Sequence, residues 1–268
     1  MPELPEVETI KNELLPYVAG KKITGVDLFW EKMLRQPSFD EFQVRIKGQK
    51  INGILRRGKY LVFKLESGDW LLIHLRMSGA LLAGRGLSPR FTRAVFHLDD
   101  GSDIYFCDPR KFGRIQLVRD KNSVLGKLGV EPMEKAFTAE VLGKLLGKRK
   151  APVKAVLLEQ GLIAGIGNMY ADEALFDAAI NPLRAAESLS DGEIQRLHRA
   201  IRTVLKIAIE SKGASISNYY RPSGEKGSAH NHFRVAHHRG EECPVCATPL
   251  ERITIRQRGS YYCPKCQK

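Results

Sequence analysis

The chain has 268 residues, and its 43 lysines and arginines outnumber its 30 aspartates and glutamates, which leaves a formal net charge of +13 at pH 7. A protein this basic suits a polyanionic partner. No apolar run approaches the roughly 18 residues of a membrane span. The composition therefore excludes a membrane protein, favours nucleic acid as the partner and allows more than one domain.

The chain opens with MPELPEVE, which places a proline at position 2. Removal of the initiator methionine, which a small following residue permits, would turn the ring nitrogen of Pro2 into a free secondary amine. An α-amino group has a pKa of about 8, so part of it is neutral and nucleophilic near pH 7. Attack on a sugar aldehyde carbon would give an iminium, the Schiff-base form of covalent catalysis. Glu3 and Glu6 follow at once; alternatively, Pro5, Glu6 and Glu8 only begin a helix.

The first half of the chain carries the pattern of one helix followed by strands. A helix is predicted over residues 5–15, because apolar residues fall on one face there. Between residues 22 and 118, segments such as 61–66 and 71–77 alternate apolar and polar positions, and glycines break the runs. We expect a β-sandwich or barrel, with Cys107 buried in a strand.

After Pro132 the apolar period becomes helical. Ser190 and Glu193 form a capping-box pattern at the start of a long helix. The residues expected on its apolar face are Ile194, Leu197, Ile201, Val204, Leu205 and Ala208. This change of pattern predicts two domains joined near residues 130–136.

Basic and glycine-rich segments in the second half suit a phosphate-bearing partner. Residues 160–168 form a glycine-punctuated connection that enters a helix at Asn168, where backbone N–H groups can bind phosphate. A basic cluster that includes Arg149 and Lys154 lies just upstream. The glycines could instead only form two tight turns, and a charge run is often a solvated face. Both alternatives stay open at this point.

Four of the five cysteines form two CxxC pairs separated by sixteen residues: Cys243 with Cys246, and Cys263 with Cys266. This spacing is typical of a four-thiolate zinc ribbon, whose tetrahedral site is closed and structural. Two disulfides are the alternative. Nothing at the N-terminus resembles a secretory signal peptide, so we expect a cytoplasmic chain with reduced thiols and one structural Zn²⁺.

Several motifs, in this order, resemble the formamidopyrimidine-DNA glycosylase (Fpg or MutM) family along the whole chain. They are PELPEVE, Arg56-Arg57-Gly-Lys59-Tyr-Leu, His74-Leu-Arg-Met77-Ser-Gly, Asp108-Pro-Arg110-Lys-Phe112-Gly, Gly165-Ile-Gly-Asn168-Met-Tyr-Ala-Asp-Glu173 and Gln257-Arg258-Gly-Ser-Tyr-Tyr. The resemblance implies an α+β protein of two domains. An N-terminal β-sandwich with an N-terminal helix would precede a C-terminal helix-two-turn-helix module followed by a zinc ribbon.

The resemblance also implies module bounds and a partner. The expected modules are the β-sandwich catalytic domain at 1–130, the helix-two-turn-helix DNA-binding module at 137–222, a lesion-capping loop region at 223–240 and the zinc ribbon at 241–268. Double-stranded DNA with an oxidised base would lie in a cleft between the domains. The protein would be a monomer associated with the nucleoid.

The activity implied is that of a bifunctional DNA glycosylase and abasic-site lyase in base-excision repair, which removes 8-oxoguanine and formamidopyrimidines. Pro2 would attack C1′ of an extruded nucleotide, and the iminium would permit β- and then δ-elimination. Glu3 is the expected proton donor, and Lys59 a further general acid. Arg258 is expected to take part in the last elimination. The alternative for Lys59 is a surface lysine of a strand.

The family further implies three side chains that fill the gap left by the extruded base, namely Met77, Arg110 and Phe112. An apolar side chain between base steps offsets part of the unstacking cost. Met77 and Phe112, taken alone, would more often be core residues. The residues expected to contact phosphate are Arg149, Lys154, Asn168 and Arg258.

Two segments depart from the family pattern. Phe91-Thr92-Arg93 stands where His-x-His is usual, so a DNA-contacting histidine is missing. In residues 228–239, Ala229 and Ala236 stand where aromatic residues are common, so we expect less stacking on an extruded base. The four histidines of this segment could suggest a second metal, although solvated loop histidines are the more common case.

Two alternative functions remain open. An endonuclease VIII-like glycosylase would excise oxidised pyrimidines, but such proteins typically open with PEGPE, and Leu4 favours the purine branch. A non-catalytic zinc-ribbon protein that only recognises damaged DNA would be favoured by retention of Met1.

Overall fold

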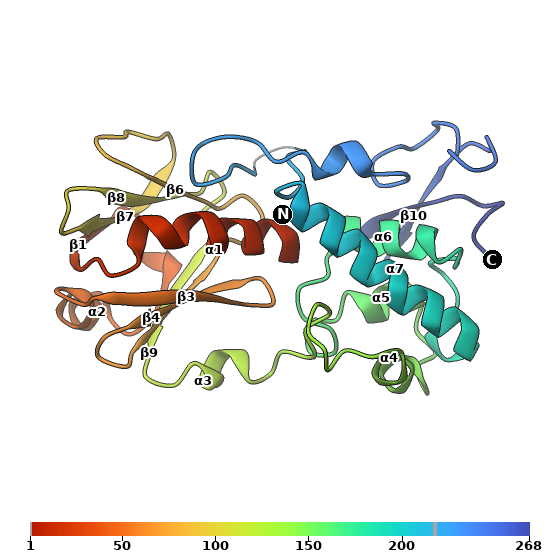
Figure 1. The fold of residues 1–268 in the computed structure, drawn as a ribbon, viewed down its shortest axis with the longest axis horizontal. Coiled ribbons are helices and arrows are strands. Elements are labelled where there is room, and N and C mark those ends of the chain that lie inside the picture. Colours follow the sequence, from red (N-terminus) through yellow and green to blue (C-terminus); the bar gives the residue numbers. More distant parts are fainter. Residues whose placement is uncertain (1, 217–218) are drawn as a thin grey trace. The chain divides into compact units, whose positions relative to one another are not determined.

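The computed structural model describes residues 2–216 and 219–268, which form two compact units (Figure 1). The first unit comprises Met1–Lys127 and Ile209–His230, and the second comprises Leu128–Ala208 and Asn231–Lys268. The chain therefore passes from one unit to the other after Lys127, Ala208 and His230. The module bounds given above remain predictions, whereas the segment Ile209–His230 belongs to the first unit.

The first unit begins with helix α1 (Leu4–Val18), which confirms the predicted N-terminal helix. Glu3 is its N-cap residue, and Pro5 lies in its first turn, where a missing N–H leaves no helical hydrogen bond unmade. Val7, Ile10 and Leu14 are fully buried. The helix packs against β3 and β4 of one sheet and β6 of the other.

Two sheets make up the rest of this unit. One sheet has the order β1 (Ile23–Leu28), β7 (Thr92–Leu98), β8 (Asp103–Cys107) and β6 (Ala80–Gly84). The other has the order β2 (Leu34–Gln36), β9 (Arg114–Val118), β5 (Trp70–His74), β4 (Tyr60–Leu65) and β3 (Ile51–Arg57). The shorter elements are a 3₁₀ helix (Glu31–Met33), α2 (Phe39–Ile46) and α3 (Asn122–Leu125).

Apolar side chains from both sheets and from α1 share one core, so the β-sandwich expectation is confirmed. Phe63 from one sheet and Phe96 and Phe106 from the other are almost completely buried in this core. Tyr219, from the returning segment, is a further member of it. Cys107 is buried at the end of β8, as predicted.

The second unit contains the predicted helices and a two-stranded hairpin. Its elements are α4 (Ala139–Leu146), α5 (Val153–Leu157), α6 (Asn168–Asp177), a 3₁₀ helix (Ala186–Ser188), α7 (Asp191–Glu210), β10 (Glu251–Ile255) and β11 (Arg258–Tyr262). Helix α7 extends two residues beyond the unit, and another 3₁₀ helix (Ala229–His232) spans the last crossing. None of the helices in the described part of the chain combines the length and the apolar character that a membrane span requires.

Helix α7 begins as its sequence predicts. The backbone N–H of Ser190 donates to Glu193 Oε2 at 2.8 Å, and the N–H of Glu193 donates to Ser190 Oγ at 3.4 Å, which forms the capping box. Leu197, Ile201 and Leu205 are buried along one face. This stripe, spaced by about one helical turn, attaches the helix to its unit.

Candidate active site and metal centre

The start of α1 encloses two carboxyl groups. Glu3 and Glu6 are 2% and 1% exposed, and they form a capping box in which each accepts the other's backbone N–H. The N–H of Glu3 donates to Glu6 Oε2 at 2.8 Å, and Glu6 Oε1 accepts the N–H of Ala214 at 2.8 Å. The reading of Pro5 and Glu6 as first-turn residues is therefore correct, and Glu6 in addition holds the returning segment against the helix.

Arg56 links α1 to the turn that carries Lys59. Its Nε donates to Glu8 Oε2 at 2.7 Å, and its Nη1 donates to the carbonyl of Gly58 at 3.1 Å. Burial alone would raise the pKa of Glu8, but hydrogen bonds from Lys11 and Arg56 outweigh burial and hold that pKa below its usual range. One guanidinium thus fixes the turn relative to the helix that Glu3 caps.

Lys59 occupies a two-residue turn between β3 and β4, after Gly58 with φ +55°. A positive φ at the first central position suits glycine and matches the twist of a hairpin. Lys59 is only 6% exposed. The alternative of a solvent-exposed strand lysine is therefore wrong.

His74 ends β5 and lies within the electrostatic influence of Lys59. Burial first, and then the charges of Arg76, Lys59 and Arg114, lower the pKa of His74 to about 3. Its Nδ1 accepts the backbone N–H of Arg76 at 3.0 Å, which leaves the ring proton on Nε2. His74 is therefore neutral at pH 7 and can donate a hydrogen bond from Nε2.

Met77 and Phe112 are 45% and 48% exposed, so the alternative that they are core residues is wrong. Arg110 is exposed as well, and its guanidinium lies 4.9 Å from the centre of the Phe112 ring. Large apolar side chains held at the surface beside a cation suit contact with stacked bases.

Lys154 was predicted to contact phosphate, but it lies in the interior of the second unit. Its side chain is fully buried, and Nζ contacts Asp172 Oδ1 at 2.6 Å and the carbonyl of Gly259 at 3.1 Å. Asn168 Nδ2 donates to the same carbonyl at 2.9 Å, and the N–H of Tyr261 donates to Asp172 Oδ2 at 3.2 Å. Burial raises the pKa of Asp172, while the Lys154 ammonium opposes that shift. The expected phosphate contact of Lys154 does not fit this enclosure; the pair instead anchors β11.

Two other basic residues of the second unit keep their side chains accessible. Arg258 is exposed at the first position of β11, directly after a turn in which Arg256 and Gln257 have φ of +44° and +62°. Such a turn places both central residues in the left-handed region. The side chain of Arg149 is 40% exposed, and its Nε donates to the carbonyl of Leu145 at 3.0 Å.

Both unusual alanines of residues 228–239 are buried. Ala229 and Ala236 are each 1% exposed, so neither side chain is available to an extruded base. The buried carboxylate of Glu173 accepts the N–H groups of three successive residues, 234–236, at 2.8 to 3.0 Å. The expectation of weaker stacking on an extruded base therefore stays a prediction.

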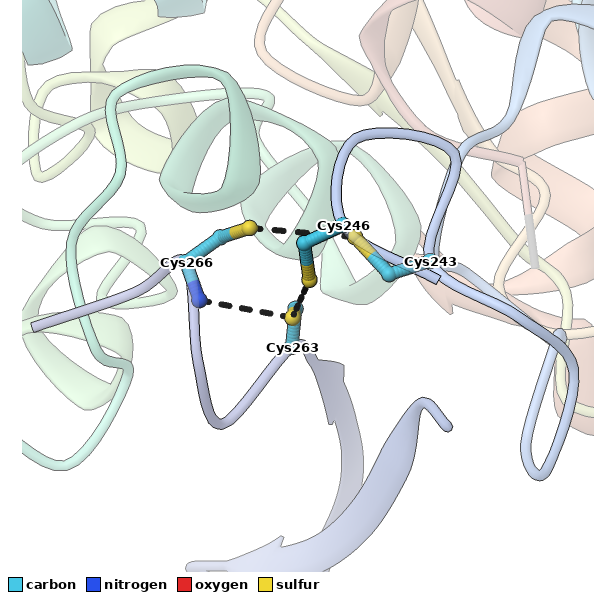
Figure 2. Close-up of side chains that lie close together, drawn as sticks. All are labelled: Cys243, Cys246, Cys263 and Cys266. Carbon is cyan, nitrogen blue, oxygen red and sulfur yellow. Dashed lines mark hydrogen bonds between the residues drawn. The ribbon is translucent and has the colours of Figure 1, made fainter. Parts of the chain in front are cut away.

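The four paired cysteines converge on one point, as Figure 2 shows. Their sulfur atoms all lie within 4.8 Å of one another, and neighbouring pairs are separated by 3.5 Å (Cys246 and Cys263) and 3.9 Å (Cys243 and Cys266). Four thiolates at 2.3 Å from one tetrahedral ion would be about 3.8 Å apart. All are free of disulfides, and no other group of metal-ligating side chains gathers within the described residues.

Comparison with protein families accounts for nearly the whole chain. The models for the formamidopyrimidine-DNA glycosylase N-terminal domain and H2TH domain match residues 1–115 and 128–219, and that for the zinc finger found in FPG and IleRS matches residues 240–268. The chain belongs to the formamidopyrimidine-DNA glycosylase family. The fold class and the single structural zinc site predicted from the sequence are confirmed.

Relatives within the formamidopyrimidine-DNA glycosylase family match from end to end. The glycosylase of Chloroflexus aurantiacus is 46% identical, and that of Pelotomaculum thermopropionicum 44%; both alignments cover 100% of this chain and 98% or 99% of the relative. The crystal structure of MutM (Fpg) from Thermus thermophilus has a TM-score of 0.91 and 39% identity, with 99% of this chain and 98% of that chain covered. A Lactococcus lactis Fpg mutant in complex with Fapy-dG-containing DNA has a TM-score of 0.93 and 33% identity, with both chains covered completely.

No role was predicted from the sequence for three polar residues of this Fpg-family chain, although all three lie inside the motifs quoted above. They are His74, Asp108 and Asp172. Asp108 and Asp172 are 0% and 1% exposed. Their place within these motifs was the available signal, because a buried polar group requires a partner that the sequence alone does not identify.

Proposed function

We propose that this protein excises oxidised purines from double-stranded DNA and cuts the strand at the resulting abasic site. The observation that carries the proposal is the end-to-end similarity to Fpg proteins solved with lesion DNA. Those complexes contain Fapy-dG, carbocyclic 8-oxoguanine and an abasic site. The net charge of +13 suits a DNA substrate. We propose that the protein acts in the cytoplasm, associated with the nucleoid.

In this proposal Pro2 is the nucleophile, once Met1 has been removed. Its nitrogen forms a bond to C1′ while the glycosidic bond breaks and the oxidised base leaves. Glu3, the next residue, protonates the sugar ring oxygen as the ring opens, and an iminium remains between Pro2 and C1′. Loss of the C2′ proton then expels the 3′ phosphate, and a second elimination expels the 5′ phosphate.

Lys59 and Arg258 serve the phosphate groups in this scheme. The buried ammonium of Lys59 supplies a proton donor close to the helix that carries Glu3, which the Arg56 bridge between α1 and the Lys59 turn supports. Arg258 is exposed at the tip of the zinc ribbon and is proposed to assist the second elimination. Arg149 and Asn168 are proposed to contact the DNA backbone, whereas Met77, Arg110 and Phe112 are proposed to fill the gap in the duplex.

Borohydride trapping tests the nucleophile directly, because reduction converts the iminium into a stable protein–DNA bond. We expect trapping on duplexes with 8-oxoguanine, and we expect Pro2→Gly to trap much more slowly. Pro5→Ala is the matched control, since Pro5 lies three residues after Pro2, in the first turn of α1, and has no free amine. Strand cleavage without any trappable adduct would exclude this mechanism.

Glu3→Gln tests the acid separately. Glutamine keeps the size of the side chain and its acceptor oxygen, so the helix start should persist. We expect normal binding of lesion DNA with base release slowed by about 10²–10⁴, the usual contribution of a positioned acid. Wild-type rates of base release in Glu3→Gln would remove Glu3 from this role.

A further inference from the structure

The three side chains proposed to enter the duplex come from two separate loops of the first unit. Met77 lies between β5 and β6, and Arg110 and Phe112 lie between β8 and β9. All three are exposed, so their own packing does not fix their positions. Contacts of the two loops with buried residues must therefore set the positions of these side chains.

The buried carboxylate of Asp108 contacts both loops. Its Oδ1 accepts the hydroxyl of Ser78, next to Met77, and the N–H of Arg110 at 3.1 Å. Its Oδ2 accepts the N–H groups of Phe112 and Gly113, both at 2.7 Å. A carboxylate offers about four lone-pair sites, so these four donors saturate it. Hydrogen bonds to a charged acceptor are also the stronger kind.

The backbone of Asp108 extends this network to residues 91–93. Its N–H donates to the carbonyl of Phe91 at 2.9 Å, and its carbonyl accepts Nε of Arg93 at 2.9 Å. Phe91 itself has φ +64°, which a phenylalanine rarely adopts without support. The segment in which the usual histidine is missing is thus fixed to the same residue.

Close packing under the two loops leaves little freedom. A Cβ added at Gly113 would lie 2.5 Å from the Phe106 ring, and one at Gly79 would lie 2.9 Å from that ring. Both loops therefore close over one aromatic side chain. Lys111 lies between Arg110 and Phe112. Its Nζ is 4.2 Å from the centre of the Trp30 ring, and this cation–π contact also holds the loop.

We propose that Asp108 is a positioning residue that joins the loops of Met77, Arg110 and Phe112 into one preformed wedge for entry into the duplex. The inference rests on the proposed role of these three side chains. Opening a base step costs a few kcal/mol. Side chains that must first be ordered would add an entropic cost to that step, whereas loops already joined by Asp108 avoid most of this cost.

Asp108→Asn tests the coupling. The amide has the size of the carboxylate but replaces one acceptor with an NH₂ group that faces backbone donors. We expect single-turnover excision of 8-oxoguanine from a paired duplex to slow by about 10- to 100-fold, the effect of a small misplacement. Cleavage at a preformed abasic site, where no base has to be unstacked, should slow less. Asp103→Asn is the control: Asp103 begins strand β8, which precedes Asp108, its carboxylate bonds to His97 and Tyr105, and the variant should match the wild type.

A second background separates positioning from general loss of structure. In a variant with alanine at Met77, Arg110 and Phe112, adding Asp108→Asn should cause no further loss of excision rate. An equal loss in both backgrounds would show that Asp108 acts elsewhere and would overturn the inference. So would wild-type excision by Asp108→Asn.

Ser78→Ala, which removes one of the four donors, covers the case in which Asp108→Asn does not fold. It should give a smaller loss of the same kind, and an unchanged rate would overturn the inference. Absence of excision and trapping by the wild type would instead contradict the proposed function. Fluorescence of 2-aminopurine beside the lesion should report slower unstacking in the Asp108 and Ser78 variants.

Discussion

Replacing Lys154 with methionine should destabilise the second unit, because it leaves the Asp172 carboxylate buried without its cation. The ion pair is 2.6 Å long, and its side chains are 0% and 1% exposed. Removing one partner of such a pair typically costs about 3–5 kcal/mol. The hydrogen bond to Gly259 adds about 1 kcal/mol to the loss. We therefore expect the free energy of unfolding to fall by about 4–6 kcal/mol near neutral pH. We also expect Arg258, the first residue of the loosened strand β11, to lose its position.

The loss should depend on pH in a defined direction. Burial raises the pKa of Asp172 above its ordinary value of 3.8, and without the Lys154 ammonium it should rise further. Between the ordinary and the raised pKa the folded state binds more protons than the unfolded state, so stability falls as pH rises. Lys154→Met should accordingly be closer to the wild type at pH 5 than at pH 8.

Urea unfolding at these two pH values, together with single-turnover strand cleavage, would measure both effects. Lys144→Met is the control, since Lys144 pairs with Glu140 on the surface and should show no measurable change. Adding Asp172→Asn to Lys154→Met should recover part of the lost stability, because no buried charge is then left uncompensated. Wild-type stability of Lys154→Met at pH 8 would refute the reasoning.

Three further predictions concern the rest of the second unit and the last crossing between units. Cys263→Ser should lose zinc and DNA affinity, whereas the control Cys107→Ser should keep both. Zinc content and a DNA-binding titration would measure these effects, and retained affinity without zinc would exclude the ribbon from DNA binding. Ala229→Phe should lower the unfolding free energy by about 1–3 kcal/mol through overpacking; an unchanged stability with greater selectivity for 8-oxoguanine would contradict the buried position. Glu173→Gln should cost about 1–3 kcal/mol in urea unfolding, because backbone donors of residues 234–236 lose a charged acceptor; an unchanged midpoint and slope would contradict it.

Features set by neighbouring residues were predictable from the sequence. The capping box of Ser190 with Glu193, the helix at the N-terminus and the cysteine pairs each depend on spacings of a few residues, and all three are present. The alternation of apolar and polar residues along the strands predicted a β-sandwich, because the apolar face of each sheet has to be covered.

Features set by contacts between distant segments were not predictable. Lys154 looked like a surface cation because its partners, Asp172 and Gly259, lie 18 and 105 residues further along the chain. Ala229 and Ala236 looked like loop residues because nothing nearby in the sequence indicates their burial. Met77 and Phe112 could equally have been core residues, since an apolar side chain carries no sign of which face it will occupy.

The return of residues 209–230 to the first unit bears on how the protein is made. Tyr219 belongs to the core of that unit, and Ala214 is bound by Glu6 at the start of α1. The ribosome has to synthesise all of residues 128–208 before it reaches these two. At about 5–20 residues per second, that delay is roughly 4–16 s. During this time the Glu6 carboxylate lacks its bond to Ala214, and the core of the first unit lacks Tyr219, while the helices of the other unit are synthesised.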